Sequence, residues 1–313
     1  MSKQSLNLSI VIPLYNEEPS LQPLAAELKV VLESLGRPYE IIFVDDGSTD
    51  GSFATLEQLN HADPQRIRVI RFRRNFGKTA ALSAAFKRAR GEIVVTMDAD
   101  LQDDPHELPK LLDKLDEGYD LVAAWREHRV DPPSKTLPSR IFNRTVSLLT
   151  GIKLHDFNCG FKAYRTGVVR DLELYGDLHR FIPVLAYWKG YDLAEVAIAH
   201  RTRRFGRSKY GWERAWSGLV DFLVVLFLTR YLRRPLQLFG TVGAICLFVG
   251  LILGLYLTYL RLFAGGIGWR PALFADILAI VVGVQLISMG LLAEMLRNFA
   301  YRGEDEYSVQ DEL

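Results

Sequence analysis

Apolar and polar positions follow two interleaved patterns over residues 8–125. Short, nearly continuous apolar runs, typical of strands covered on both faces, occur at 8–14, 40–44, 68–72, 92–97 and 121–125. Between them, segments with helical spacing of apolar residues occupy 18–35, 50–60, 78–90 and 105–117. This β-α-β-α order predicts an α/β fold: a doubly wound, mostly parallel sheet with helices on both faces.

The pattern changes in the last third of the chain. The 80 residues from Ser217 to Leu296 hold only eight charged side chains, although 24% of the whole chain is charged. The uncharged stretch 236–260 would form a helix of roughly 37 Å, enough to cross a hydrocarbon core of about 30 Å. A second candidate span is 272–296, whose two acidic residues lie near its ends. The alternative for both stretches is a buried core helix.

Basic residues predict the orientation of these spans. Five arginines stand outside the two spans, at 230, 233, 234, 297 and 302, against two in the connecting loop 261–271. This bias puts both termini in the cytoplasm. The first nine residues contain no apolar signal region. We therefore expect the large N-terminal domain to be cytoplasmic.

Two further segments mix basic and apolar side chains. Residues 211–232 combine aromatic side chains with arginines, and 134–149 is a second, less pronounced case. Such segments suit helices that lie in the headgroup layer, although ordinary core helices remain an alternative. The predicted organisation is a globular domain, a juxtamembrane amphipathic helix, a two-helix transmembrane region and a cytoplasmic tail, at 1–210, 211–235, 236–297 and 298–313.

Composition excludes several classes of protein. A net charge of +1 argues against a dedicated nucleic-acid binder. A hydrophobic content of 49% is ample for a packed core and argues against disorder. Two cysteines in 313 residues exclude a disulfide scaffold, so Cys159 and Cys246 are expected to be reduced.

Polar clusters follow the predicted strands at their carboxyl ends, where open α/β sheets bind ligands. Asp98 and Asp100 flank one residue after the fourth strand. Residues two apart in an extended segment point the same way, and two converging carboxylates repel each other unless a cation lies between them. Oxygen ligands suit Mg²⁺ or Mn²⁺. A solvated acidic turn is the alternative.

Two other clusters are typical of nucleotide sites. Asp45 and Asp46 end the second strand, where a carboxylate can accept hydrogen bonds from a base or ribose; an Asx turn before the next helix is the alternative. Residues 74–78, Arg-Asn-Phe-Gly-Lys, supply donors before a helix and form a fair phosphate site. Neither the P-loop motif nor the dinucleotide-binding glycine motif occurs.

A second polar group precedes the membrane part. It includes Arg126, Arg140, Asp156 and the segment 200–210, which holds five cations and Ser208. A basic run before a span commonly attracts anionic lipids. The functional alternative is a phosphate clamp, where a lipid phosphate meets a soluble donor.

Together these motifs resemble glycosyltransferase family 2. V-I-P-L-Y-N-E, V-D-D-G-S-T-D-G, R-N-F-G-K, M-D-A-D-L-Q-D-D-P and R-F-G-R-S-K-Y occur in that order over residues 8–210. More closely, the chain is similar to polyprenyl-phosphate glycosyltransferases: dolichol-phosphate mannose synthase and its bacterial relatives of the GtrB and ArnC type. The resemblance implies a GT-A fold and inverting transfer from a nucleotide sugar at a bacterial plasma membrane.

The resemblance also implies roles for individual residues. The nucleotide pocket would be lined by Pro13, Tyr15, Glu17, Asp46 and Lys78. Asp98 would touch the ribose or the metal, and Asp100 and Gln102 would hold the divalent ion. The acceptor phosphate or donor diphosphate would be contacted by Arg126, Arg140, Arg201, Arg203, Ser208 and Lys209. Asp156 would be a general base or an acceptor-orienting group.

The expected reaction transfers a hexose, with UDP-glucose as first choice, to undecaprenyl phosphate. GDP-mannose and a UDP-linked amino-arabinose are alternative donors. A non-catalytic, nucleotide-sugar-binding scaffold and a tethered transferase with a soluble acceptor are competing functions. The Q-x-x-R-W motif of processive synthases is absent, which favours single transfer to a lipid. Small-residue spacings in the first span, including Gly250–Gly254, predict packing between protomers of a homo-oligomer.

Overall fold

The computed structural model describes residues 6–126, 143–144, 146–148, 150–174, 176, 178–199, 201, 235–263 and 270–300. Described residues up to 201 belong to one compact unit, and those from 235 onward belong to a second. Within the larger unit, the predicted Ser134–Leu149 surface helix is described only in part, and its described residues from 143 to 148 are helical. Arg140, Arg203, Ser208, Lys209, the juxtamembrane residues 211–234 and the tail from 301 lie outside the described residues.

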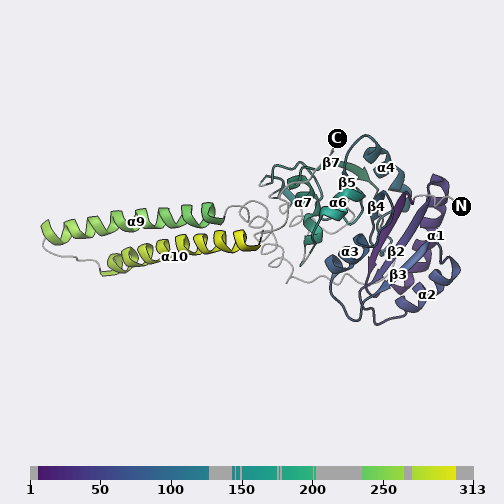
Figure 1. Ribbon diagram of the computed structural model, residues 1–313, viewed down its shortest axis with the longest axis horizontal. Helices are drawn as coiled ribbons and strands as arrows, with labels where there is room; N and C mark the ends of the chain where they lie inside the picture. Colours follow the sequence, from purple (N-terminus) through teal and green to yellow (C-terminus); the bar gives the residue numbers. More distant parts are fainter. Residues whose placement is uncertain are drawn as a thin grey trace. The chain divides into compact units, whose positions relative to one another are not determined.

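The larger unit is built on a seven-stranded sheet (Figure 1). Its strands are β1 (Leu8–Leu14), β2 (Tyr39–Asp45), β3 (Ile67–Arg71), β4 (Ile93–Thr96), β5 (Leu121–Arg126), β6 (Lys162–Arg165) and β7 (Leu193–Ile198). They lie in the order β3-β2-β1-β4-β6-β5-β7. Strand β6 is antiparallel to both neighbours, and every other pairing is parallel. The predicted mostly parallel α/β sheet is confirmed.

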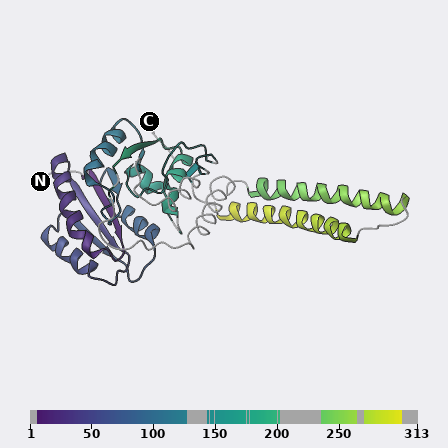
Figure 2. The same ribbon diagram turned by 180° about the vertical axis from the view of Figure 1, so that it is seen from behind.

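Helices cover both faces of this sheet (Figures 1 and 2). One core contains apolar residues of α1 (Glu18–Leu35), α2 (Ser52–Ala62) and α4 (Leu108–Asp116). The other contains those of α3 (Lys78–Phe86), α6 (Thr166–Asp171) and α7 (Ile182–Trp188). Two short 3₁₀ helices, η1 (Pro105–Glu107) and η2 (Leu178–Phe181), precede α4 and α7. Strands β1 and β2 are buried at every position because both faces are covered.

Several element ends differ from the predicted ones, for local reasons. Helix α2 begins at Ser52, where Asp50 Oδ1 accepts the Ser52 N–H at 3.0 Å. The predicted helix at 105–117 begins as 3₁₀, with the Asp104 side chain accepting the His106 N–H. Strand β4 ends at Thr96. Asp98 and Asp100 therefore lie in a turn beyond the strand, so strand alternation does not set the direction of their side chains.

The sheet topology brings distant segments to one edge. The carboxyl ends of β1, β2, β3, β4, β5 and β7 share that edge because these strands are mutually parallel. Strand β6 runs the other way, so it begins at this edge. The loop 156–161 that leads into β6 consequently joins the loops that follow the parallel strands.

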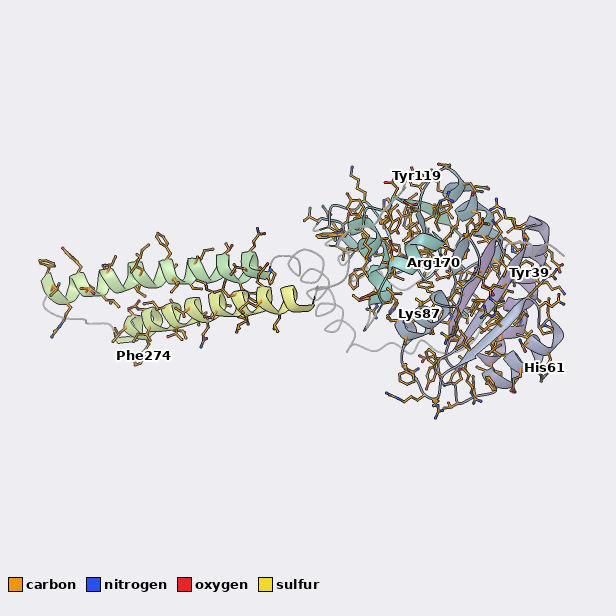
Figure 3. All side chains as sticks on the ribbon, in the orientation of Figure 1. Tyr39, His61, Lys87, Tyr119, Arg170 and Phe274 are labelled. Atoms are coloured by element: carbon orange, nitrogen blue, oxygen red, sulfur yellow. The ribbon has the colours of Figure 1, made fainter. Side chains whose placement is uncertain are left out.

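The second unit consists of two long helices, α9 (Pro235–Phe263) and α10 (Arg270–Ala300). Both are long and apolar enough to cross a membrane. Only 11% and 17% of their most apolar windows are buried, so neither has the burial of a soluble core helix. Large apolar side chains such as Phe274 stand out from both helices (Figure 3).

Glycines set the contact between these two helices. A Cβ on Gly243 would lie 2.7 Å from the carbonyl of Gly283, and one on Gly250 would lie 2.7 Å from the Ile280 side chain. A Cβ on Gly254 would lie 3.2 Å from the Asp276 carboxylate. These glycines therefore bring α9 and α10 of the same chain together. The small-residue pattern thus has an explanation within one chain and no longer argues for contacts between protomers.

Candidate active site

The loops that follow β1 and β2 are joined by hydrogen bonds. The Asn16 and Glu17 N–H groups donate to Ser48 Oγ and Ser52 Oγ at 2.9 and 3.0 Å. Asn16 Oδ1 in turn accepts the Thr49 N–H at 2.8 Å. Asn16 adopts φ 54°, a left-handed conformation that asparagine tolerates. This network fixes the segment between Pro13, which is buried in β1, and Glu17.

Asp46 holds the loop that precedes α3. Its two carboxylate oxygens accept the N–H groups of Phe76 and Gly77 at 2.7 and 2.9 Å. Burial raises the pKa of Asp46, and these two N–H groups partly offset the rise. Its predicted place in a nucleotide pocket is therefore combined with a structural role. The Asx-turn alternative applies to Asp45, whose Oδ1 accepts the Ser48 N–H at 2.8 Å.

Gly47 allows these two loops to approach each other. Its φ is +72°, and a Cβ there would lie 2.7 Å from the backbone Cα of Arg74. The close approach leads into α3, whose first residue is Lys78. The β2 and β3 loops thus form one continuous support for the Lys78 side chain.

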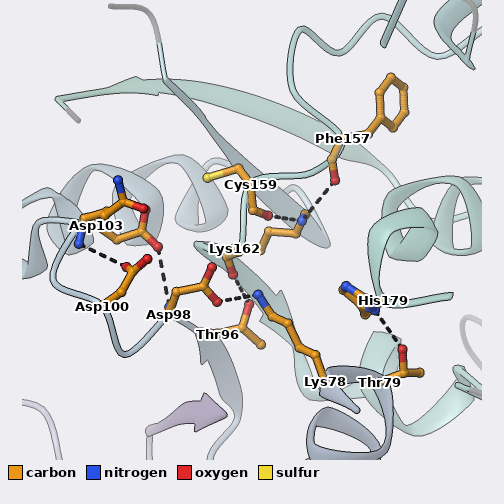
Figure 4. Close-up of polar contacts among 12 residues, drawn as sticks. Lys78, Thr79, Thr96, Asp98, Asp100, Asp103, Phe157, Cys159, Lys162 and His179 are labelled. Carbon is orange, nitrogen blue, oxygen red and sulfur yellow. Dashed lines mark hydrogen bonds and ion pairs between the residues drawn. The ribbon is translucent and has the colours of Figure 1, made fainter. Parts of the chain in front are cut away.

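Lys78 forms an ion pair with Asp98 (Figure 4). Both side chains are 30% exposed. Burial would raise the pKa of Asp98, but the Lys78 ammonium lowers it overall, so the carboxylate is ionised at neutral pH. Two residues that the sequence placed on one nucleotide site are in direct contact. Lys78 thereby also neutralises the charge of one of the predicted metal ligands, Asp98.

Gly160 forms the surface behind Asp98. A Cβ on Gly160 would lie 2.6 Å from Asp98 Oδ1. The carbonyl of Gly160 accepts the Thr96 hydroxyl at 2.7 Å, which ties this loop to the end of β4. Gly160 was not among the site residues predicted from the sequence. Its only sequence signal is a glycine between two apolar residues, Cys159 and Phe161, shortly before β6.

The turn after β4 gathers three carboxylates, those of Asp98, Asp100 and Asp103 (Figure 4). Asp100 Oδ1 accepts the Gln102 N–H at 3.2 Å. The intervening Leu101 is buried and has φ 59°, a strained conformation for leucine that the buried side chain holds in place. Burial, followed by the charges of Asp98 and Asp100, raises the pKa of Asp103 to about 6 despite an opposing effect of Arg126.

The residue types in this turn are those that a divalent cation would use. Asp98, Asp100 and Gln102 supply the hard oxygen atoms that Mg²⁺ and Mn²⁺ prefer. The buried Asp103 Oδ1 has no hydrogen-bond partner among the described residues, as expected beside a site that a cation completes. Asp103 was not among the residues predicted from the sequence, although it belongs to the same acidic motif.

Arg126, Asp156 and Lys162 form the neighbouring part of the edge. Burial alone would lower the pKa of Arg126, but Cys159, Asp103 and Asp156 raise it above its ordinary value. The buried Lys162 Nζ donates to the carbonyls of Phe157 and Cys159, and burial lowers its pKa. Cys159 is a free, buried thiol whose pKa burial raises to about 11, so it is inert; Cys246 is also free.

His179 reaches the same region from η2 (Figure 4). Its Nδ1 lies 2.7 Å from the Thr79 hydroxyl, one residue after Lys78. Burial and the nearby Lys78 cation lower the pKa of His179 to about 2, so the imidazole is neutral. Sequence reasoning missed this contact because a lone histidine 100 residues away carries no local signal.

Arg201 has two carboxylate partners. Its guanidinium lies 2.7 Å from Glu27 of α1 and 2.7 Å from Asp104. Its backbone N–H donates to the Gln102 carbonyl at 3.0 Å. Ligand atoms of Glu27, Asp104 and His106 lie within 4.8 Å of one another, but the Arg201 cation already balances two of these groups. This cluster is a brace for the acidic turn, and Arg201 remains only a predicted phosphate contact.

Replacing Arg201 by alanine is expected to lower the free energy of unfolding by about 1–3 kcal/mol, because two half-buried carboxylates lose a charged donor. Arg66→Ala is the matched control, since Arg66 lies 3.6 and 3.7 Å from Glu33 and Asp63 at an exposed site. The control should cost at most about 1 kcal/mol. Urea unfolding of the full-length protein in detergent measures both. Equal losses of unfolding free energy in the two variants would contradict the bracing role of Arg201.

The chain is similar to known glycosyltransferases over most of its length. Glycosyl transferase family 2 matches residues 9–173. A dodecaprenyl-phosphate galacturonate synthase from Rhizobium johnstonii is 37% identical over 96% of this chain and 90% of its own length. An undecaprenyl-phosphate 4-deoxy-4-formamido-L-arabinose transferase from Pseudomonas paraeruginosa is 38% identical over 92% of this chain and 84% of its own.

Solved structures share the GT-A fold. Glucosyl-3-phosphoglycerate synthase from Mycobacterium tuberculosis, in complex with Mn²⁺ and UDP-glucose, superposes with a TM-score of 0.56 at 20% identity, covering 71% of this chain and 78% of its own. Mannosyl-3-phosphoglycerate synthase from Rubrobacter xylanophilus gives a TM-score of 0.58 at 19% identity, covering 71% and 74%. The family match, the full-length relatives and the edge site agree with the sequence motifs, and this chain belongs to glycosyltransferase family 2.

Proposed function

We propose that this enzyme transfers one sugar from a nucleotide sugar to a polyprenyl phosphate at the cytoplasmic face of a membrane. The observation that carries the proposal is the meeting of two polar groups at one sheet edge. The first is the Lys78–Asp98 pair with the acidic turn, and the second is Arg126 beside Asp156. Two long apolar helices in the same chain fit a lipid acceptor.

The first group suits the donor. Asp98, Asp100 and Gln102 would hold a divalent ion, which neutralises charge developing on the departing nucleoside diphosphate. Lys78 adds a cation at the start of α3, where the helix N-terminus also favours phosphate. The segment from Pro13 to Glu17 and Asp46 would line the pocket for the base and ribose.

The second group suits the acceptor. Arg126 stays charged and can bind a phosphate. A phosphate monoester has a second pKa of about 6, so it is mostly ionised at neutral pH and needs little help from a general base. Asp156, buried beside Arg126, therefore orients the acceptor-binding guanidinium. The basic segment 203–209 would add further contacts.

Chemically, an acceptor phosphate oxygen attacks the anomeric carbon as the bond from that carbon to the nucleoside diphosphate breaks. In-line attack inverts the configuration, so an α-linked donor gives a β-linked lipid phosphate sugar. The leaving group departs as the nucleoside diphosphate, and no external base or oxidant is required.

Several nucleotide sugars are candidate donors for this reaction. The relatives compared above are named for transfer of galacturonate and 4-deoxy-4-formamido-L-arabinose, whereas UDP-glucose was the first choice from the sequence. We therefore expect a UDP-linked sugar, with the uronate and the amino-arabinose derivative tested beside glucose.

Incubation with undecaprenyl phosphate and Mn²⁺ should move label from one of four radiolabelled donors into an organic-extractable product. The donors are UDP-glucose, UDP-galacturonate, UDP-4-deoxy-4-formamido-L-arabinose and GDP-mannose. One donor should exceed the others by roughly tenfold or more, since a buried polar contact to the correct sugar is lost with the wrong one. Thin-layer chromatography of the extract identifies the product.

Three outcomes would contradict parts of this proposal. Label that appears only in a water-soluble product would indicate a soluble acceptor. Donor binding without turnover for any lipid would support the scaffold alternative. Preference for GDP-mannose would overturn the expectation of a UDP-linked donor while leaving the lipid acceptor in place.

A further inference from the structure

Glu195 is a partly buried acid outside both polar groups described above. It lies in β7, and its side chain is only 11% exposed. A carboxylate with so little exposure needs hydrogen-bond donors to offset its lost hydration. All the donors found for it among the described residues come from one short segment, His155–Asp156, which includes the proposed acceptor-orienting acid.

Both oxygens of Glu195 are used on this segment. Oε1 accepts the backbone N–H groups of His155 and Asp156 at 2.9 and 3.0 Å. Oε2 lies 2.7 Å from His155 Nδ1 and 3.0 Å from the same His155 backbone nitrogen. One side chain thus fixes two consecutive peptide groups and an imidazole.

Other contacts restrain the same turn less directly. Asn143 Nδ2 donates to the His155 carbonyl at 2.8 Å. The His155 ring stacks on Trp125, with centroids 4.2 Å apart. Asp156 Oδ1 accepts the Asn158 N–H at 3.1 Å. With its backbone held by Glu195 and one oxygen held by Asn158, Asp156 has a fixed direction.

Strand alternation separates Glu195 from the reacting groups. Glu195 pairs with Ala123 across β5 and β7, and Ala123 belongs to the core on the α3 side of the sheet. Arg126 is three residues further along β5, so its side chain leaves the opposite face. Glu195 and Arg126 therefore face opposite sides of the sheet, and the 155–156 turn that Glu195 holds is the link through which it can act on Arg126.

We propose that Glu195 is a positioning residue for sugar transfer, which acts by aiming Asp156 at Arg126. The inference rests on the proposed acceptor role of Asp156 and Arg126. It requires hydrogen-bond acceptors at position 195 and does not require a negative charge, because the fixed groups are two neutral N–H groups and an imidazole that can change tautomer.

Three substitutions of the full-length protein test this requirement. Glu195→Gln keeps an oxygen for both N–H groups and should retain turnover within about threefold. Glu195→Met has similar volume without an acceptor and should lower turnover roughly 10²-fold, the scale of a 1 Å misplacement. Glu195→Asp keeps the charge but withdraws the carboxylate by one methylene, and it should also lose turnover. The KM for the nucleotide sugar should change less than twofold throughout.

A loss of turnover with little change in the KM for the nucleotide sugar separates a positioning role from general damage to the fold. Equal losses in the Gln and Met variants, or full turnover in the Met and Asp variants, would overturn the role of Glu195. If the Met variant fails to fold, as judged by UDP binding, comparison of turnover in the Asp and Gln variants decides whether Glu195 is a positioning residue.

A double substitution separates this inference from the proposed function. If Asp156→Asn already lowers turnover, adding Glu195→Met should lower turnover by less than about a further threefold. Both substitutions remove the same contribution, that of a correctly placed Asp156. If the two substitutions lower turnover independently, so that their effects multiply, the proposal that Glu195 acts through Asp156 is overturned. Full turnover in Asp156→Asn alone would overturn the acceptor role of Asp156. That result would count against the proposed function itself, and it is obtained with Glu195 unchanged.

Discussion

Replacement of Asp100 by alanine is expected to abolish sugar transfer while leaving the protein folded. The side chain lies in a turn beyond β4, and its removal takes one of the proposed ligands from the divalent ion. Loss of a preorganised group that stabilises transition-state charge typically costs roughly 10²–10³-fold in turnover, and an ion held by few ligands should be lost with it. The measurement is label transferred to the organic phase at saturating Mn²⁺.

Asp113→Ala is the matched control, because this exposed aspartate lies on α4 outside the acidic turn. It should keep full activity, and both variants should unfold near the wild-type temperature. Chelation by EDTA should likewise stop the wild-type reaction, and added Mn²⁺ or Mg²⁺ should restore it. Full activity in Asp100→Ala, or in the chelated enzyme, would remove the metal assignment.

Gly160→Ala is expected to reduce transfer by roughly 10²-fold, the usual scale for misplacing a catalytic group by about 1 Å. The added Cβ would lie 2.6 Å from Asp98 Oδ1, a distance that forces the carboxylate to move. Movement of Asp98 breaks its ion pair with Lys78 and displaces a proposed metal ligand. Turnover and the Mn²⁺ concentration for half-maximal activity should change together.

The control is Gly167→Ala in α6. Among the described residues, a Cβ there would meet only the Tyr191 hydroxyl, at 3.9 Å, so activity should stay at the wild-type level. The substitution tests whether an added methyl group at a glycine near β6, beyond the strand end opposite the site, is harmful in itself. If Gly160→Ala retained wild-type turnover and metal dependence, the close packing of Asp98 against this loop would have no catalytic importance.

Sequence patterns were sufficient for the fold class and for the two apolar helices. Strands buried on both faces, such as Leu8–Leu14, must be nearly all apolar, so composition alone reveals them. A helix such as Glu18–Leu35 shows its buried face through spacing and its end through Gly36 at φ 62°. Element ends were less predictable, because local side-chain bonds, such as Asp50 to Ser52, decide them.

The site was predictable only where its residues are adjacent in sequence. The acidic turn and the Asn75–Lys78 loop are short motifs, and both lie at the edge where strand order predicted ligands. Asp103, Gly160, His179 and Glu195 were missed. Gly160, His179 and Glu195 each contribute through a contact to a residue far away in the chain, and one sequence contains no information about such pairs. Asp103 lies within the acidic motif itself, and the sequence pattern does not separate its role from that of its neighbours.

The amino-acid sequence by itself thus determined the α/β character of the globular unit, the two apolar helices and the acidic motif, because burial and local chemistry depend on neighbours along the chain. The tertiary structure alone decided that β6 runs antiparallel to β4 and β5. That direction carries Asp156 and Gly160 to the edge that holds Asp98 and Arg126. Hydrogen bonding between strands fixes this direction, and it is a long-range choice that no local pattern records.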